Sequence, residues 1–263
     1  MNNKYDEFYF ENDRNYPANV YWSLFDKNRM EAIRKYDGHM FCPVCKLAPL
    51  TIARGNQRRY FKVIESDMDK HDVDCPYRHK MATKKETCNF YKDLDSTDIR
   101  NRLISCLNRM LKRVTKNMNG NGLPVREEKK SKNSFIEIKG NYGERKYLPH
   151  KNLNVGNLEE DMDIQKIYYG KCAVYIRKYI PKDKAAIKMY YLKILNRNRK
   201  KNICDIVISP YVYNYLRDEL ADIPEEEEEA LNYYVCFSGV LKKYKSFYNC
   251  KLKDSRLLVL EKE

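Results

Sequence analysis

The chain has 263 residues and a formal net charge of +14, from 51 Lys and Arg against 37 Asp and Glu. This length allows one large domain or two modest ones, each able to bury its own core. So large a positive surplus favours a polyanionic partner such as DNA, RNA or an anionic membrane surface. The competing explanation is a Lys-rich protein whose charge serves only solubility, so charge alone does not decide.

No run approaches the roughly 18 to 20 apolar residues of a membrane span, and the N-terminal residues do not resemble a signal peptide. We therefore expect a soluble, cytoplasmic protein with no membrane partner. The nine cysteines fit a reducing compartment. Five of them lie singly in apolar runs, as reduced core cysteines do: Cys106, Cys172, Cys204, Cys236 and Cys250.

Residues 1–118 are expected to form a zinc-binding module followed by a basic helix. A short helix is predicted over residues 21–36. A longer helix begins at Asp95 or Ser96, either of which can cap it. Its apolar residues recur at helical spacing, and its other face carries basic residues: Arg100, Arg102, Arg109, Lys112, Arg113 and Lys116.

Residues 119–165 read as a linker with one short strand. Gly, Pro and charged residues interrupt the pattern over residues 117–134. The strand is predicted at residues 135–140, where apolar and polar residues alternate.

Residues 166–263 predict five strands, with one helix after the third. Pro210 begins the helix, and the strands are expected at 166–179, 187–198, 202–209, 232–244 and 247–260. This order resembles that of OB-fold nucleic-acid-binding domains. Gly170 and Gly239 lie where tightly coiled strands often bend. An SH3-like barrel is the alternative, but the internal helix argues against it. The predicted class is α+β.

Paired cysteines and nearby histidines point to a metal site in the first module. Cys42 and Cys45 are separated by two residues, a spacing that lets two thiolates meet one metal. His71 and Cys75 lie four residues apart, so both could project from one helical turn. We expect a closed, structural Zn²⁺ site built from these four residues.

The fourth ligand stays open at this stage. His79 lies four residues after Cys75 and suits the same helical argument, and His39 lies three residues before Cys42. A redox pair at Cys42 and Cys45 is a third possibility. The sequence after Cys45 does not read as the helix that such a pair normally opens.

A basic hairpin is predicted between the two ligand pairs. Its turn lies at residues 54–57, and its arginines could contact phosphates. The candidate binding residues are Arg54, Arg58, Arg59 and Lys62. The alternative is a hairpin that is simply solvated.

The Cys42-Pro43-Val44-Cys45 motif, the Arg-Gly-x-x-Arg turn at 54–58 and the strand Arg59-Tyr60-Phe61-Lys62 resemble the zinc segment of competence protein CoiA and its relatives. The chain departs from that family at Tyr60 and Lys62, where the family tends to carry His. The resemblance covers only this segment. It implies a zinc-stabilised module in a DNA-processing setting, such as a mobile element or a phage-defence system.

That family follows its zinc segment with a nuclease-like domain, which this chain does not clearly match. Glu137 and Lys139 look like half of a metal-dependent nuclease motif. The motif also needs an acidic residue on the preceding strand, and the sequence supplies none there. We expect a protein that is not an enzyme.

Strand alternation predicts an apolar face and an opposite face of aromatic and basic residues. Tyr rings can stack on unpaired bases while Lys and Arg follow the phosphates, although Tyr also simply favours strands. The candidate residues on the barrel are Tyr169, Lys171, Tyr175, Arg177, Tyr191, Lys193, Arg197, Lys242, Lys243 and Lys245. We expect a non-catalytic nucleic-acid-binding protein that prefers single strands, with DNA or RNA left open.

Five consecutive glutamates, Glu225–Glu229, follow the helix. Such a run is usually a solvated turn, but it could dock a basic partner protein. The alternative function is therefore an interaction or scaffold subunit of a nuclease or defence complex.

Overall fold

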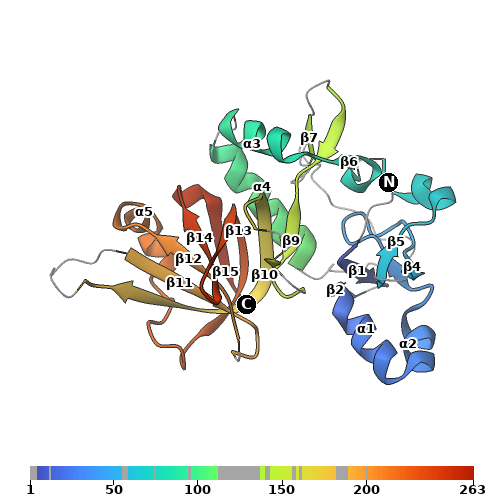
Figure 1. The fold of residues 1–263 in the computed structure, drawn as a ribbon, viewed down its shortest axis with the longest axis horizontal. Helices are drawn as coiled ribbons and strands as arrows, with labels where there is room; N and C mark the ends of the chain where they lie inside the picture. Colours follow the sequence, from blue (N-terminus) through green and yellow to red (C-terminus); the bar gives the residue numbers. More distant parts are fainter. Residues whose placement is uncertain are drawn as a thin grey trace, which may run out of the picture.

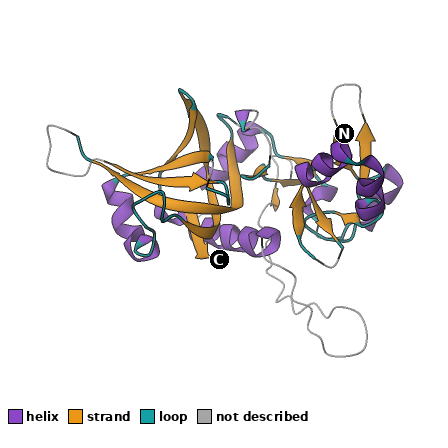
Figure 2. Ribbon diagram, turned by 90° about the horizontal axis from the view of Figure 1, so that it is seen from below, coloured by secondary structure: helices purple, strands orange, loops and turns teal. Residues whose placement is uncertain are grey.

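The computed structural model describes residues 5–11, 13–54, 59–73, 75–93, 96–111, 137–139, 143–155, 158–159, 162–181, 189–199 and 201–263. The fold is α+β, as predicted. An N-terminal part of small sheets and helices lies beside a C-terminal β-barrel (Figure 1). Figure 2 shows the same two parts from below, with the longest strands gathered in the barrel. None of the described helices is long and apolar enough to cross a membrane.

The first sheet of the N-terminal part has three short antiparallel strands in the order β2-β1-β3. Asn28 divides the helix predicted over residues 21–36 into two, because its backbone is extended and its side chain accepts a hydrogen bond from Glu31 N, which caps the second helix. The elements are β1 (Glu7–Phe10), β2 (Asn15–Pro17), α1 (Ala18–Lys27), α2 (Arg29–Tyr36) and β3 (Met40–Phe41).

A hairpin and two short 3₁₀ helices follow. The predicted hairpin forms with Arg54 opposite Arg59. The elements are β4 (Thr51–Arg54), β5 (Arg59–Lys62), two short 3₁₀ helices, η1 (Glu65–Lys70) and η2 (Pro76–Arg78), and β6 (Lys80–Met81). Strand β6 then joins β7 (Glu137–Lys139) and β8 (Arg145–Tyr147) in a small sheet of its own.

Two helices connect this region to the barrel: α3 (Lys84–Asp93) and α4 (Ser96–Leu111). The predicted apolar stripe of α4 is buried, with Leu103, Cys106 and Leu107 at its centre. It packs on the outer surface of the barrel, so that one hydrophobic core runs from the N-terminal part to Ile167 and Cys236.

The barrel closes through the neighbour sequence β10-β11-β12-β14-β13-β10, with β12 and β14 parallel and the other pairs antiparallel. This is the connectivity of an OB-like barrel. Its elements are β10 (Gln165–Tyr179), β11 (Met189–Leu195), β12 (Asn202–Ile208), α5 (Pro210–Leu220), β13 (Leu231–Tyr244) and β14 (Phe247–Leu252). The predicted inner row is buried: Tyr168, Cys172, Val174 and Ile176.

Closure depends on one long strand. The first half of β10 pairs with β13 and its second half pairs with β11, so β10 belongs to both sides of the barrel. The glycine predicted to mark a bend in the fourth strand is needed for close packing, because a Cβ at Gly239 would lie 2.2 Å from Cys250 Sγ.

Two predictions about element boundaries change. The fifth predicted strand, 247–260, breaks after β14, because Asp254 caps a 3₁₀ turn, η4 (Ser255–Leu257), with a hydrogen bond from Arg256 N. Strand β15 (Leu258–Lys262) then pairs with β13. Residues 119–165, predicted as a linker with one strand at 135–140, contain β7 within that strand and also β8 and β9 (His150–Asn152), and β9 adds a parallel strand to β10.

Candidate metal centre and nucleic-acid interface

Four buried side chains meet in the N-terminal part: Cys42, Cys45, His71 and Cys75. Their ligand atoms all lie within 4.8 Å of one another. Cys42 Sγ is 3.9 Å from Cys75 Sγ, and Cys45 Sγ is 3.3 Å from His71 Nδ1. Those separations fit the edges of a tetrahedron with metal–sulfur bonds of about 2.3 Å. The cluster could therefore hold one metal ion.

Local backbone structure positions each ligand. A tight turn after β3 carries the first two cysteines, with Lys46 N donating to Cys42 O and Cys42 N donating to Ala48 O. Lys46 adopts a left-handed conformation, φ 62°, to complete the turn. His71 ends η1 and Cys75 precedes η2, so two short 3₁₀ helices supply the other two ligands.

The cluster includes one of the candidate histidines. His71 is buried among the thiols, whereas His39 is exposed and pairs with Glu11 at 2.7 Å. His79 ends η2 and lies outside the four-residue cluster. Burial, followed by hydrogen bonds to Cys45 and Cys75, raises the pKa of Cys42. A bound cation would offset that cost for the thiolates.

Tyr5 is a residue that sequence reasoning missed. Its hydroxyl lies 3.2 Å from His71 Nε2, the ring nitrogen that faces away from the thiols. Burial raises the pKa of Tyr5, so the phenol stays neutral. With Nδ1 bound to a metal, Nε2–H would donate to the Tyr5 oxygen, which fixes the ring orientation. No local motif marks Tyr5, because it lies 66 residues from His71.

The predicted basic hairpin is only partly described. Arg59 pairs with Asp26, and its guanidinium lies 5.8 Å from the ring centre of Trp22. Lys62 is half-buried at the end of β5. Arg54 lies opposite Arg59 in the ladder, and Arg58 lies outside the described residues.

The outer surface of the barrel brings several predicted residues together. Arg177, Tyr191, Val207 and Lys251 are paired in succession across β10, β11, β12 and β14. A second row runs through Tyr175, Lys193, Asp205, Asn249 and Lys242. Cross-strand neighbours on one face lie close enough to form a common surface.

Two tyrosines predicted for this surface are buried. Tyr169 lies under the N-terminal part, where its hydroxyl donates to Glu7. Tyr175 lies under the acidic run, and its hydroxyl donates to Glu227 at 3.1 Å. Strand alternation correctly predicted that both side chains point out of the barrel, but other segments of the chain cover them. Neither ring is open for stacking on a base.

Several predicted cations already have carboxylate partners. Lys193 Nζ lies 2.6 Å from Asp205, and Lys243 pairs with Glu159. Lys171 and Arg197 both contact Glu263, at 3.3 and 2.9 Å. Arg177, Lys242 and Lys245 are exposed.

The β13–β14 hairpin tip carries aromatics that the sequence reasoning left out. Tyr244 and Phe247 are direct cross-strand partners, 65% and 52% exposed. Lys245, with φ 55°, forms the turn, and its ammonium lies 5.8 Å from the Tyr244 ring centre. The alternation of Lys and aromatic residues in Lys242–Phe247 was the available signal.

The glutamate run folds back on the barrel. Glu225 pairs with Lys178, Glu227 accepts from Tyr175, and Glu228 O accepts from Arg199 at 3.2 Å. These contacts hold the run over the outer surface of β10.

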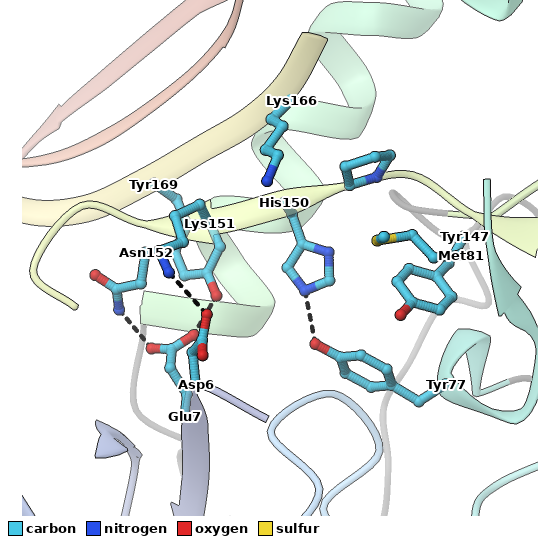
Figure 3. A pocket seen from close by; sticks show the side chains of 11 residues that line it. Asp6, Glu7, Tyr77, Met81, Tyr147, His150, Lys151, Asn152, Lys166 and Tyr169 are labelled. Atoms are coloured by element: carbon cyan, nitrogen blue, oxygen red, sulfur yellow. Dashed lines mark hydrogen bonds and ion pairs between the residues drawn. The ribbon is translucent and has the colours of Figure 1, made fainter. Parts of the chain in front are cut away.

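A polar cavity of about 150 Å³ lies where the N-terminal part meets the barrel (Figure 3). Glu7 accepts from Asn152 and Tyr169, and burial raises its pKa to about 7. His150 accepts from Tyr77 at 2.8 Å through Nε2 while Nδ1 donates to Leu148 O, and burial lowers its pKa to about 4. The two groups are therefore largely neutral near pH 6, which suits a packed interface.

Contacts of a residue that lines this cavity link the Cys/His cluster to the barrel. The Tyr77 ring lies 4.7 Å from that of Tyr5, which contacts His71, and Tyr77 contacts His150 on β9.

Comparison with protein-family models, with curated proteins and with solved structures finds no match to the chain.

Proposed function

We propose that this protein is a non-catalytic nucleic-acid-binding protein that prefers single strands. The observation that carries the proposal is the exposed Tyr244–Phe247 pair at the hairpin tip of an OB-like barrel. The two rings offer flat exposed faces beside exposed lysines, and unpaired bases can stack on such faces.

The charge around the tip supports the same ligand. Lys242, Lys245 and Lys251 are exposed on the tip and the adjoining strand. Lys251 continues into the row that contains Tyr191 and Arg177. Phosphates of a strand whose bases stack on the tip would meet these cations, and binding would weaken as salt rises.

The metal in this proposal is Zn²⁺ with a structural role. Three thiolates and one imidazole, all buried, are the donor set that zinc prefers in closed sites. Buried ligands leave no open position for a substrate. The metal would hold the N-terminal part in place beside the barrel, in the DNA-processing setting that the CoiA-like segment implies.

Fluorescence anisotropy with labelled single-stranded DNA, single-stranded RNA and duplex DNA of equal length tests the proposal. Changing Tyr244→Ala and Phe247→Ala together should weaken single-strand binding at least ten-fold, given ~1–3 kcal/mol per stacked base. The matched control is Tyr211→Ala with Tyr215→Ala, an equally exposed tyrosine pair on α5. No binding at low salt, or equal loss in both double variants, contradicts the proposal.

A scaffold role through Glu225–Glu229 is the second candidate. Its support is weaker because Glu225, Glu227 and Glu228 already make contacts within the chain. A stoichiometric partner that is lost when Glu226 and Glu229 are changed to Gln, together with weak oligonucleotide binding, would favour it.

A further inference from the structure

A groove separates the N-terminal part from the end of the barrel, and no sequence motif predicts it. The groove encloses about 460 Å³, a size common for ligand sites. One wall comes from β2, α1 and the end of α4, and the other from β10 and the β11–β12 turn. It lies away from the Tyr191 row, on the side where Lys171 and Arg197 project.

Three cations line this groove: Arg14, Lys171 and Arg197. They come from β10, the β11–β12 turn and the N-terminal part, so only the folded chain brings them together. Glu7 also lines the groove, but burial raises its pKa to about 7, which reduces its negative charge near neutrality. Cations therefore outnumber carboxylates among the side chains that line the groove.

A carboxylate of the chain occupies the cationic end. Glu263 Oε1 lies 2.9 Å from Arg197 Nη2 and 3.3 Å from Lys171 Nζ, and it also acts electrostatically on Arg14. Only 24% of the Glu263 side chain is exposed. One carboxylate shared by several cations marks a place where an anion is stabilised, and a phosphate offers more acceptor oxygens to the same donors.

The remaining walls combine apolar side chains with carboxamides. Pro17, Val20 and Met110 give an apolar surface, and the Tyr16 ring lies beside them. Five carboxamides also line the groove, and the first four of them already make hydrogen bonds within the chain: Asn15, Asn152, Asn154, Asn196 and Asn198. The Asn15 Oδ1 atom is buried without a hydrogen-bond partner, and Asn15 Nδ2 donates to Pro43 O at 3.0 Å.

The groove also leads to the hairpin tip. A second cavity, of about 480 Å³, is lined by Lys201, Phe247 and Tyr248. Asn154 and Asn196 line both cavities, so the two meet at these residues. A nucleic-acid strand stacked on Phe247 would therefore enter the groove past these two residues.

We propose that the groove binds the sugar-phosphate backbone of a single strand that continues from the hairpin tip, and that Glu263 occupies the phosphate position in the free protein. The inference rests on the proposed function and adds a route and a competitor to it. Binding exchanges one anion for another: the phosphate takes the Lys171 and Arg197 donors, and the Glu263 carboxylate moves into water. No covalent step is involved.

The test compares Glu263→Gln with Glu219→Gln by anisotropy on one single-stranded oligonucleotide, long enough to span tip and groove, over a salt series. Glu219 lies on α5, and its carboxylate pairs with Arg100 at 2.8 Å. Glu219→Gln therefore makes the same charge change at a similarly exposed ion pair. Glu263→Gln should tighten binding about two- to five-fold, because the competing surface ion pair is removed. Glu219→Gln should leave the affinity within about two-fold of wild type.

Arg197→Ala completes the test, because the exposed Arg197 side chain can be removed without loss of the fold. It should weaken binding and lower the salt slope by about 0.7, the value for one lost phosphate contact on a single strand. Equal affinities for the two glutamine variants, with an unchanged slope for Arg197→Ala, overturn the groove. If the tip variants still lose binding in that case, the proposed function stands without it. If neither wild type nor Glu263→Gln binds at low salt, both proposals are wrong.

Discussion

Tyr5 Oη lies 3.2 Å from His71 Nε2, although 66 residues separate them in the chain. Tyr5 also pairs with Phe61 through a backbone bridge, so the hairpin that follows the first cysteines holds Tyr5 against the histidine. A ligand imidazole needs such a partner on its second nitrogen to keep one tautomer and one ring orientation.

Tyr5→Phe should therefore lower zinc affinity by about 10- to 100-fold, the range for lost outer partners of metal ligands. Competition with a chromogenic chelator measures this directly. Tyr21→Phe is the matched control, because Tyr21 is also buried and its hydroxyl contacts Asp37 rather than a ligand. An equal loss in both variants would mean that Tyr5 acts only through packing.

The choice between the two histidines is open to a simple measurement. His71→Ala should lose the bound zinc, because it removes one of four ligands, whereas His79→Ala should retain one zinc per chain. Elemental analysis of the purified variants gives the stoichiometry. Zinc in His71→Ala together with its loss from His79→Ala would reverse the assignment.

Removal of zinc should loosen more than the segment around the ligands. One core connects Cys42 and Cys75 to α4, Ile167 and Tyr169. We expect faster amide exchange after chelation over residues 39–81 and α4, while Ile194 and Ile206 in the barrel interior stay protected, because they belong to a separate core. Hydrogen-exchange mass spectrometry checks this. Unchanged protection in α4 would show that the two parts are independent.

Sequence patterns predicted the barrel well because each strand has one buried face. The row through Tyr168, Cys172 and Val174 alternates with polar residues, and Pro210 marks the helix start. The Cys/His cluster was also predictable, since Cys42 and Cys45 are close in sequence and His71 and Cys75 are close to each other.

Coverage of the outer face was not predictable from local pattern. Alternation places Tyr169 and Tyr175 outward, but Glu7 and Glu227 come from distant segments and bury them. This burial depends on which segments meet in the folded chain, and the alternation of side chains along one strand does not encode those contacts.

Glu7 and His150, the neutral pair at the interface cavity, should affect stability in opposite directions as the pH changes. Glu7 has its pKa raised to about 7, so its contribution to stability is full below about pH 4.5 and is lost as the pH rises through 7. His150 has its pKa lowered to about 4, so its contribution is full above about pH 6.5 and is lost as the pH falls through 4. The two trends oppose each other between these limits.

Glu7→Gln separates the two effects. The free energy of unfolding of wild type minus that of Glu7→Gln should fall by roughly 2–4 kcal/mol between pH 4.5 and 7.5. Taking the difference cancels the protonation of the metal ligands, which both proteins share. Urea denaturation across this pH range gives the values, and a flat difference would mean that Glu7 is ionised in the folded protein.

Closure of the barrel brings β13 and β14 very close together at Gly239. A Cβ at residue 239 would lie 2.2 Å from Cys250 Sγ, far closer than a carbon and a sulfur can approach. Cys250 is fully buried in the barrel core on β14, so its sulfur can move away only by displacing other core side chains. Gly239→Ala should therefore cost about 1–3 kcal/mol in the free energy of unfolding, the usual cost of overpacking.

A second change should rescue this variant. Cys250→Ala removes the sulfur that the new methyl group would meet, so the double variant should be more stable than Gly239→Ala alone. Urea denaturation of the two single variants and the double variant gives the coupling energy, which should exceed about 1 kcal/mol for groups in direct contact. Additive effects would place the cost of Gly239→Ala in backbone conformation, and the close approach to Cys250 would not be its cause.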